Sequence, residues 1–216
     1  MERLTPLEGR VLASLVEKDL TIPQHYPLTL HALLAACNQV SNREPVTAFT
    51  EDGLLGALES LKAKRMVRAV LPSHGRSVVR YRHVLDEALG LDAPQLSVIA
   101  VLELRGPQTV AELRVRTERM GMIESVDHEL GLLAAREEPL VERVGRRSGE
   151  KGDRWASLLA GPVSREPDPR GVEPLHPDVE ELRRDVDTVR AELETLRDAL
   201  ETLRAGLDDL RTSLGG

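Results

Sequence analysis

Six histidines and one cysteine are the side chains of this 216-residue chain that are best suited to metal binding or nucleophilic chemistry. The histidines are His25, His31, His74, His83, His128 and His176. They form no His-Glu-x-x-His helix, and no second cysteine completes a zinc-ligand pattern. Cys37 has no base beside it, and the Gly-x-Ser-x-Gly turn of serine hydrolases is missing. We therefore expect a protein that is not an enzyme, with no metal and no cofactor.

The glycine-rich segment at Gly145 and the segment around Cys37 are both better explained by structure than by chemistry. The segment GRRSGEKG, which begins at Gly145, lacks the Gly-Lys-Ser/Thr ending of a phosphate-binding loop, so a hairpin turn is the better prediction. Cys37 lies in the apolar segment LLAACNQ, which predicts a buried structural thiol. A single cysteine also excludes an internal disulfide and is compatible with a reducing cytoplasm.

A stretch without acids is the strongest sign of a polyanionic partner. Between Ser60 and Leu85 no Asp or Glu occurs. The bases of this stretch are Lys62, Lys64, Arg65, Arg68, Arg76, Arg80 and Arg82. Such a group can neutralise neighbouring phosphates of double-stranded DNA. The alternative is a mixed, solvated surface whose acids come from other segments. The charge balance of residues 1–165, 22 acids against 22 bases, favours neither interpretation.

The starts of two predicted helices argue against the reading of base edges. In a helix-turn-helix, the first residues of the third helix approach the bases. Here they are Glu51 and Asp52 in one copy and Glu124 to Asp127 in the other. Acids stabilise a helix N-terminus but repel the DNA backbone. Both helices therefore favour folding or a protein partner over sequence-specific DNA recognition.

The elements that position these residues form a module that occurs twice. The first copy opens with Thr5, Pro6 and Glu8, which predict an N-cap, a first helical position and a capping box. The second copy opens at Ala93 and its first helix ends near Gly106. Further helices are predicted at residues 28–38 and 51–65 of the first copy, and at 110–119 and 125–136 of the second.

Each copy then ends in a predicted β-hairpin, MVRAVL with VVRYRHVL and LVERVG with DRWASLL. Tyr81 and Trp155 occupy matching places, 74 residues apart. Three helices followed by a hairpin are the order of a winged helix, so we predict a mainly α protein of the α+β class. It would have two tandem winged-helix domains, at residues 1–88 and 89–161. A pair of unrelated α+β domains is the alternative.

The remainder of the chain predicts a linker and a coiled coil. Residues 162–177 are rich in proline and charge, which is typical of an extended linker. Residues 178–214 then carry an unbroken heptad pattern. Its apolar positions are Val179, Leu182, Val186, Val189, Leu193, Leu196, Leu200, Leu203, Leu207 and Leu210, with Leu214 after them.

The charges that flank this seam favour a parallel pair of helices. In a parallel dimer, Asp178, Asp185 and Glu192 of one chain face Arg183, Arg190 and Arg197 of the other. An antiparallel pair would place arginine against arginine. We therefore predict a C-terminal parallel coiled coil that forms a homodimer. The alternative is one amphipathic helix that folds back on its own domains.

The sequence carries no sign of a membrane or of export. The segment MERLTPLEGR lacks the basic start and apolar run of a signal peptide. The longest apolar stretch, near residue 100, is too short to span a bilayer. We expect a cytoplasmic protein with no membrane contact.

Two segments resemble the signatures of the YceH family of bacterial proteins. They are PLTLHALLAACNQVSNREPV at residues 27–46 and RGPQTVAELRVRTERM at residues 105–120. With the hairpins, the resemblance extends over residues 4–161. It implies two winged-helix domains in one chain, inferred DNA binding and no defined catalytic residues.

The first of these segments contains a polar cluster of Asn38, Gln39, Ser41, Asn42 and Arg43. One interpretation is structural, in which amides and hydroxyls satisfy the backbone of a long connection. The other is functional, in which amides such as that of Asn42, together with Arg43, bind phosphate or the backbone of a partner. In the second copy, Arg114, Arg116 and Arg119 stand among Glu112 and Glu118, which makes that site the weaker candidate.

Two functions remain open. The first, which we favour, is a dimeric DNA-associated protein, a transcriptional regulator for example, that contacts phosphates through the first wing. The alternative is a protein–protein assembly module that uses its winged helices as docking blocks. The first depends on one basic stretch and on the habits of a fold, and fold is a weak guide to function.

Overall fold

The structure is a computed structural model that describes residues 3–71, 78–145 and 152–160. These residues fall in one compact unit, Met1–Glu173. The linker at 162–177, the heptads at 178–214 and Arg76 lie outside the described residues. The predictions of a coiled coil and a homodimer therefore stay predictions.

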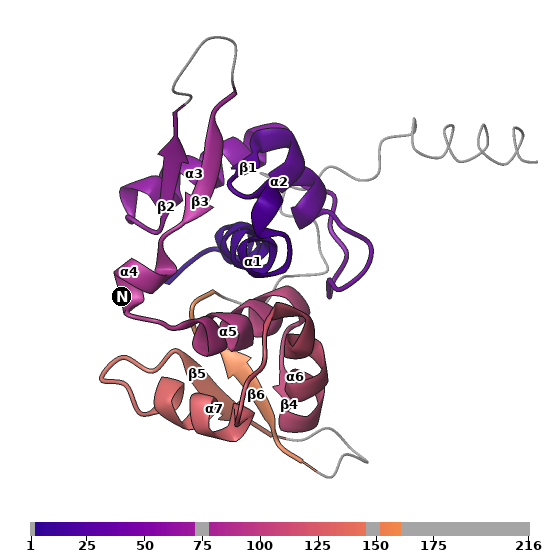
Figure 1. Cartoon of the computed structure of the whole chain (residues 1–216), viewed down its shortest axis with the longest axis vertical. Coiled ribbons are helices and arrows are strands. Elements are labelled where there is room, and N and C mark those ends of the chain that lie inside the picture. The colour runs from indigo at the N-terminus through magenta and orange to yellow at the C-terminus, as the bar shows by residue number, and fades with distance from the viewer. Residues whose placement is uncertain (1–2, 72–77, 146–151, 161–216) are drawn as a thin grey trace, which may run out of the picture. The chain divides into compact units, whose positions relative to one another are not determined.

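The described chain consists of two halves that share the order helix, strand, helix, helix, strand, strand (Figure 1). The first half contains α1 (Pro6–Thr21), η1 (Pro23–His25), β1 (Leu28–Thr29), α2 (Leu30–Cys37), α3 (Glu51–Ala63), β2 (Val67–Val70), β3 (Arg80–His83) and α4 (Leu85–Leu89). The second contains α5 (Ala93–Arg105), β4 (Gln108–Thr109), α6 (Val110–Thr117), η2 (Glu118–Met120), α7 (Val126–Ala134), β5 (Val141–Val144) and β6 (Arg154–Ser157). The mixture of helices and small antiparallel sheets is an α+β fold, as the sequence predicts.

The internal repeat extends to the sheets. Their strand orders are β1-β3-β2 and β4-β6-β5, with every pair antiparallel. Tyr81 pairs with Ala69 and Leu28, and Trp155 pairs with Arg143 and Gln108. The predicted equivalence of Tyr81 and Trp155 is confirmed. The two-residue strands β1 and β4 were not predicted because so short a segment has no measurable periodicity.

The helix starts follow from local capping chemistry. Thr5 Oγ1 accepts a hydrogen bond from the Glu8 amide at 3.2 Å, and the Glu8 carboxylate accepts one from the Thr5 amide at 2.7 Å, so the predicted capping box is confirmed. At the start of α2 the Thr29 hydroxyl accepts a hydrogen bond from the Ala32 amide, without the reciprocal bond of a capping box. The predicted helix at 28–38 is therefore shorter, because its first two residues belong to β1.

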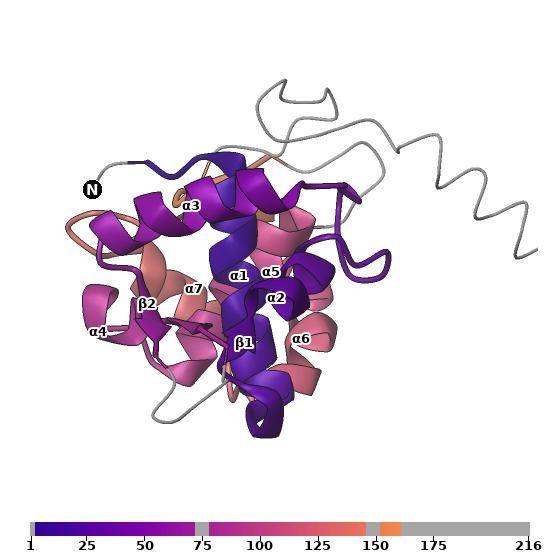
Figure 2. The same cartoon turned by 90° about the horizontal axis from the view of Figure 1, so that it is seen from above.

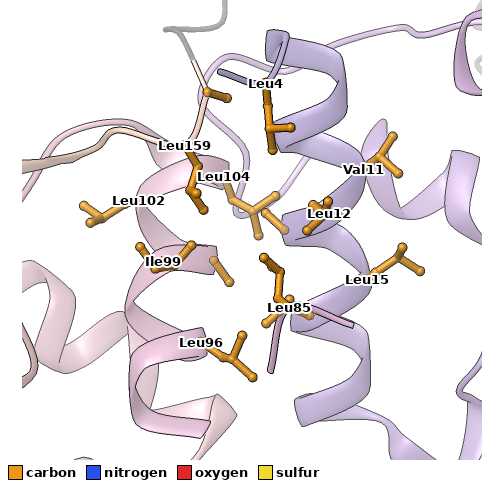
Figure 3. Packing of buried hydrophobic residues seen from close by; sticks show 14 of the residues in the cluster. Leu4, Val11, Leu12, Leu15, Leu85, Leu96, Ile99, Leu102, Leu104 and Leu159 are labelled. Atoms are coloured by element: carbon orange, nitrogen blue, oxygen red, sulfur yellow. The ribbon is translucent and has the colours of Figure 1, made fainter. Parts of the chain in front are cut away.

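The first helices of the two halves, α1 and α5, pack side by side in the middle of the unit (Figures 1 and 3). Leu12 and Leu15 of α1 and Ile99 and Leu104 of α5 are all almost fully buried. Burying each such side chain contributes roughly 1.5–3 kcal/mol. The two halves therefore share one hydrophobic cluster, which was not anticipated from the sequence.

The ends of the repeat strengthen this junction. Leu4 forms a parallel bridge with Ala160, and the Leu4 amide donates to the Leu159 carbonyl at 2.8 Å. A second hydrogen bond joins the halves at the end of α5, where the Glu44 amide donates to the Leu104 carbonyl at 2.8 Å.

Seen from above, α3 crosses α1 (Figure 2). The two hairpins lie on opposite sides of the α1–α5 pair (Figure 1).

Within the described ranges, no helix is both long and apolar enough to cross a membrane.

Candidate nucleic-acid interface

The lysines at the end of α3 are paired with acids from other parts of the fold. Lys62 Nζ lies 2.8 Å from Glu59 Oε1, one turn earlier on the same helix. Lys64 Nζ lies 2.9 Å from Glu8 Oε1, the carboxylate that also caps α1. Lys64 is therefore held by a buried carboxylate in the free protein, whereas the Lys62–Glu59 pair is exposed and contributes little to stability.

The arginines on the face of the first hairpin share one acid. Arg68 Nη2 on β2 lies 2.6 Å from Glu87 Oε2, and Arg82 Nη2 on β3 lies 2.7 Å from Glu87 Oε1. The exposed fractions of the three side chains are 57%, 37% and 45% for Arg68, Arg82 and Glu87. Ion pairs this exposed contribute about 0–1 kcal/mol each, so a phosphate can compete for both arginines.

Arg65 and Arg80 differ from the other described bases of this stretch. Arg80 is exposed and donates from Nη1 to the Pro27 carbonyl at 2.7 Å, which leaves its charge without a carboxylate among the described residues. Arg65 is exposed and has a φ of 57°, a left-handed conformation that glycine adopts more easily at the end of a helix. Most of the acid-free stretch is thus a mixed surface, with Arg65 and Arg80 as its available cations.

The third helices of the two halves expose acids and leucines. Glu51 and Asp52 at the start of α3 are exposed, and Leu55 on the same helix is 37% exposed. On α7, Asp127 is exposed and Leu132 is 45% exposed. Lys62 is the single Lys or Arg of these two helices, and it is paired with Glu59. These surfaces do not suit the negatively charged grooves of DNA.

The polar cluster after α2 has the structural role that one of the two interpretations assigned to it. The Asn38 side chain donates to the Phe49 carbonyl at 2.9 Å and accepts from the Phe49 amide at 2.8 Å. The Gln39 amide donates to the Ser41 hydroxyl at 2.9 Å. These bonds hold the connection between α2 and α3 against the ends of the helices that it joins.

Arg43 is buried within the fold, which corrects its prediction as a DNA contact. Its side chain and that of Glu17 are both 0% exposed, and Arg43 Nη2 lies 2.6 Å from Glu17 Oε2. Arg43 also donates to the Ala36 carbonyl at 2.7 Å. A charge buried in this way is engaged on all sides and is not presented to a phosphate in this structure.

The charge of Glu17 depends on that pairing. Burial by itself raises the pKa of the Glu17 carboxyl. The hydrogen bonds and charge of Arg43, together with the charges of Arg119 and Lys18, lower it by more, so the pKa lies below its ordinary value. Arg10 is a second buried cation, about two turns earlier on α1. It donates to the Pro45 carbonyl at 2.9 Å and to the Cys37 carbonyl at 3.3 Å. Burial, followed by the nearby Arg43 charge, lowers the pKa of Arg10 to about 10.

Sequence reasoning missed Arg10 and Glu17. They lie seven residues apart on α1, hence on one face of a helix whose other residues are largely apolar. The seven-residue spacing within an otherwise apolar face predicts that both charges lie on the core-facing side of the helix. It does not identify the residues with which they pair.

Cys37 is fully buried, as predicted, and burial raises the pKa of its thiol to about 11. We expect Ellman's reagent to react very slowly with the folded protein at pH 8, since only about one thiol in a thousand is ionised there. In guanidinium chloride one thiol per chain should react within the mixing time. Rapid reaction of the native protein would contradict the buried position.

The described residues include no cluster of His, Cys, Asp or Glu that could hold a metal ion. The strands β5 and β6 on either side of the glycine-rich segment pair antiparallel, and residues 146–151 of that segment lie outside the described residues. Between these two strands, the Arg143 guanidinium lies 5.2 Å from the centre of the Trp155 ring.

The geometry thus defines an internally duplicated α+β protein with a mixed basic surface and a buried ionic network. Residues 4–150 match the family described as "Protein of unknown function, DUF480". The chain is 52% identical over 161 residues to a UPF0502 protein of Geotalea uraniireducens, covering 73% of each chain. It is 46% identical over 170 residues to one of Pelobacter propionicus, covering 77% of each. A Burkholderia vietnamiensis relative is 41% identical over 167 residues, 76% of this chain and 70% of the relative. The chain belongs to this DUF480 family.

Proposed function

We propose that the protein is a non-enzymatic, DNA-associated protein of the YceH type, built from two winged-helix domains and dimerised by the heptads at 178–214. Each half has the three helices and the hairpin that a winged helix requires. The contact with DNA is made to phosphates, through the first hairpin and the end of α3. The cytoplasm is the proposed location.

The observation that carries the proposal is the state of Arg65 and Arg80. Both are exposed, and neither forms an ion pair with a carboxylate within the part of the chain that the structure describes. Arg65 also has a backbone conformation that favours glycine. Such a conformation lowers the stability of the fold by about 1 kcal/mol or more when the residue is not glycine, and residues that adopt it often mark functional sites. Arg68 and Arg82 add two guanidinium groups that a phosphate can take from Glu87.

The exposed acids of α3 and α7 favour contacts with the DNA backbone over contacts with base edges. Because the helices that would read base edges expose Glu51, Asp52 and Asp127, DNA is bound through its backbone with little preference for sequence. Dimerisation by the heptads would bring two such surfaces together and raise the avidity of weak sites.

A pair of variants with opposite expected effects tests the surface. Replacing both Arg65 and Arg80 with Ala should weaken binding to a random duplex and reduce the slope of log K against log salt by about 1.8, two phosphate contacts at about 0.9 each. Glu87→Gln should instead strengthen binding, because it releases Arg68 and Arg82. Fluorescence anisotropy over a salt series measures both effects.

The matched control is Arg143→Ala, on β5 of the second hairpin, where the guanidinium stacks on Trp155. It should leave the affinity and the salt slope unchanged. Binding that is equal in all three variants would discard the first hairpin as the DNA surface.

A second candidate function rests on the exposed leucines. Leu55 on α3 and Leu132 on α7 are flanked by acids, a composition suited to docking a protein. In this assembly function, the halves are docking blocks and the heptads form the dimer. Leu55→Asp should then abolish capture of a partner from a lysate of the source cells while leaving DNA binding intact.

A further inference from the structure

Arginines from both halves of the repeat lie close together beside α1. Arg43 and Arg119 both contact Glu17 of α1, and Arg105 contacts Asn42, the neighbour of Arg43 in the sequence. Arg116 is near enough to Arg105 to repel its charge. Arg43 comes from the connection between α2 and α3, Arg105 ends α5, Arg116 lies on α6 and Arg119 lies on η2. In the sequence, Arg43 belongs to the first polar cluster, and Arg114, Arg116 and Arg119 form its weaker counterpart. The structure adds Arg105 and brings the first half to the same place.

Hydrogen bonds between the halves fix the positions of these side chains. Arg105 Nη2 donates to Asn42 Oδ1, and Arg119 Nη2 donates to Glu17 Oε1. Asn42 has a φ of 61°, in the left-handed region that asparagine tolerates better than most residues. Two arginines of the second half are thereby held against the connection and the first helix of the first half.

The carboxylates at this place are shared among several cations. Glu17 is in contact with Arg43, with Arg119 and, at 3.6 Å, with Lys18 Nζ. Glu112 lies 3.5 Å from Arg116 Nη2 and 3.1 Å from Arg154 Nη1. Two carboxylates thus serve five cations. Glu44 and Glu118 are the sequence neighbours of Arg43 and Arg119.

The neighbouring arginines also affect the pKa of Arg105. Burial lowers the pKa of its guanidinium, and repulsion from Arg116 and Arg119 lowers it further. The attraction of Glu17 opposes this shift without cancelling it. An anion that entered beside Arg105 would relieve the repulsion.

We propose that Arg105, Arg116 and Arg119 form a binding site for a phosphate group at the junction of the two halves. The side chains of Arg116 and Arg119 are 30% and 38% exposed, so an anion from solvent can reach them. Guanidinium groups bind phosphate oxygens through paired, charge-assisted hydrogen bonds. The site is separate from the first hairpin and does not depend on the proposed function. Its phosphate belongs either to a small molecule or to a nucleic-acid backbone.

Isothermal titration with pyrophosphate, at constant ionic strength in a chloride buffer, tests the site on the full chain. The wild type should bind one pyrophosphate per chain. The variant with both Arg105→Gln and Arg116→Gln should bind it at least about tenfold more weakly, since two charge-assisted contacts are lost. Arg143→Gln, in the second hairpin, is the matched control and should bind like the wild type.

Thermal unfolding of the same variants without pyrophosphate shows whether they are folded. Arg116→Gln alone loses one partly exposed ion pair, so it keeps the fold even if the double variant does not, and it too should bind more weakly. Pyrophosphate binding that is absent in the wild type, or equal in Arg116→Gln and the wild type, overturns the proposal.

The same variants, titrated into random duplex DNA, distinguish the two sources of phosphate. A loss of affinity for both probes assigns the site to a nucleic-acid backbone. A loss for pyrophosphate alone assigns it to a small phosphorylated molecule. In either case the result for the hairpin variants is independent, so failure of the proposed DNA surface and failure of this site are separate outcomes.

Discussion

Replacing Arg43 with Met should lower the free energy of unfolding by about 3–5 kcal/mol, because it leaves the buried Glu17 carboxylate without its main partner. The substitution also removes two hydrogen bonds to the Ala36 carbonyl. Arg119 and Lys18 still contact Glu17, which places the loss toward the lower end of that range. Equilibrium unfolding in urea, monitored by circular dichroism, gives the difference from the shift of the midpoint.

The control for this prediction is the double variant Arg43→Met with Glu17→Gln. The neutral amide side chain that replaces the Glu17 carboxylate no longer needs a buried cation, so the double variant should be more stable than Arg43→Met alone. Arg114→Met, on the exposed part of α6, should change stability by less than about 0.5 kcal/mol. If Arg43→Met were as stable as the wild type, the side chain would be on the surface after all.

Replacing Gly9 with Ala should destabilise the protein by about 1–3 kcal/mol, although alanine is the better helix former. A Cβ added at Gly9 would lie 2.5 Å from Glu103 Oε2 and 2.6 Å from Ala160 Cβ. Glu103 has little room to move, because the Ala160 amide donates to it at 3.3 Å. The methyl group would therefore push α1 away from α5 at the junction of the halves.

Gly56→Ala is the matched comparison, since Gly56 also lies within a helix, α3, but has no atom within 4 Å of an added Cβ. It should stabilise the protein by roughly 0.5–1 kcal/mol through helix propensity alone. The two substitutions are chemically identical and have opposite expected signs. Stabilisation by both would mean that α1 and α5 do not approach closely at Gly9.

Local signals accounted for most of the predicted elements. The capping residues at Thr5 and the hydrophobic period of α1 depend on neighbours within one or two turns, and they predicted the residue at which that helix begins. The hairpins were predicted from β-branched runs on either side of a turn. The short helix α4, whose start at Leu85 has no capping side chain, was missed.

Long-range pairings explain what the sequence could not predict. Arg43 and Glu17 are 26 residues apart, and nothing local distinguishes this arginine from an exposed one. The stretch from Ser60 to Leu85 contains no acid, yet Glu8 and Glu87 lie against its bases in the fold. The contact between α1 and α5 likewise depends on which faces of two separate modules meet.

The most direct test of DNA association is a titration of fluorescent random-sequence duplex DNA with the purified wild-type protein, read by anisotropy at several salt concentrations. We expect submicromolar binding at low salt that weakens steeply as salt rises, because counterions are released from the phosphates. A second duplex of unrelated sequence should bind with similar affinity. No binding at the lowest salt concentration would contradict DNA association and leave the exposed leucine faces of α3 and α7 as the surfaces to test for a protein partner.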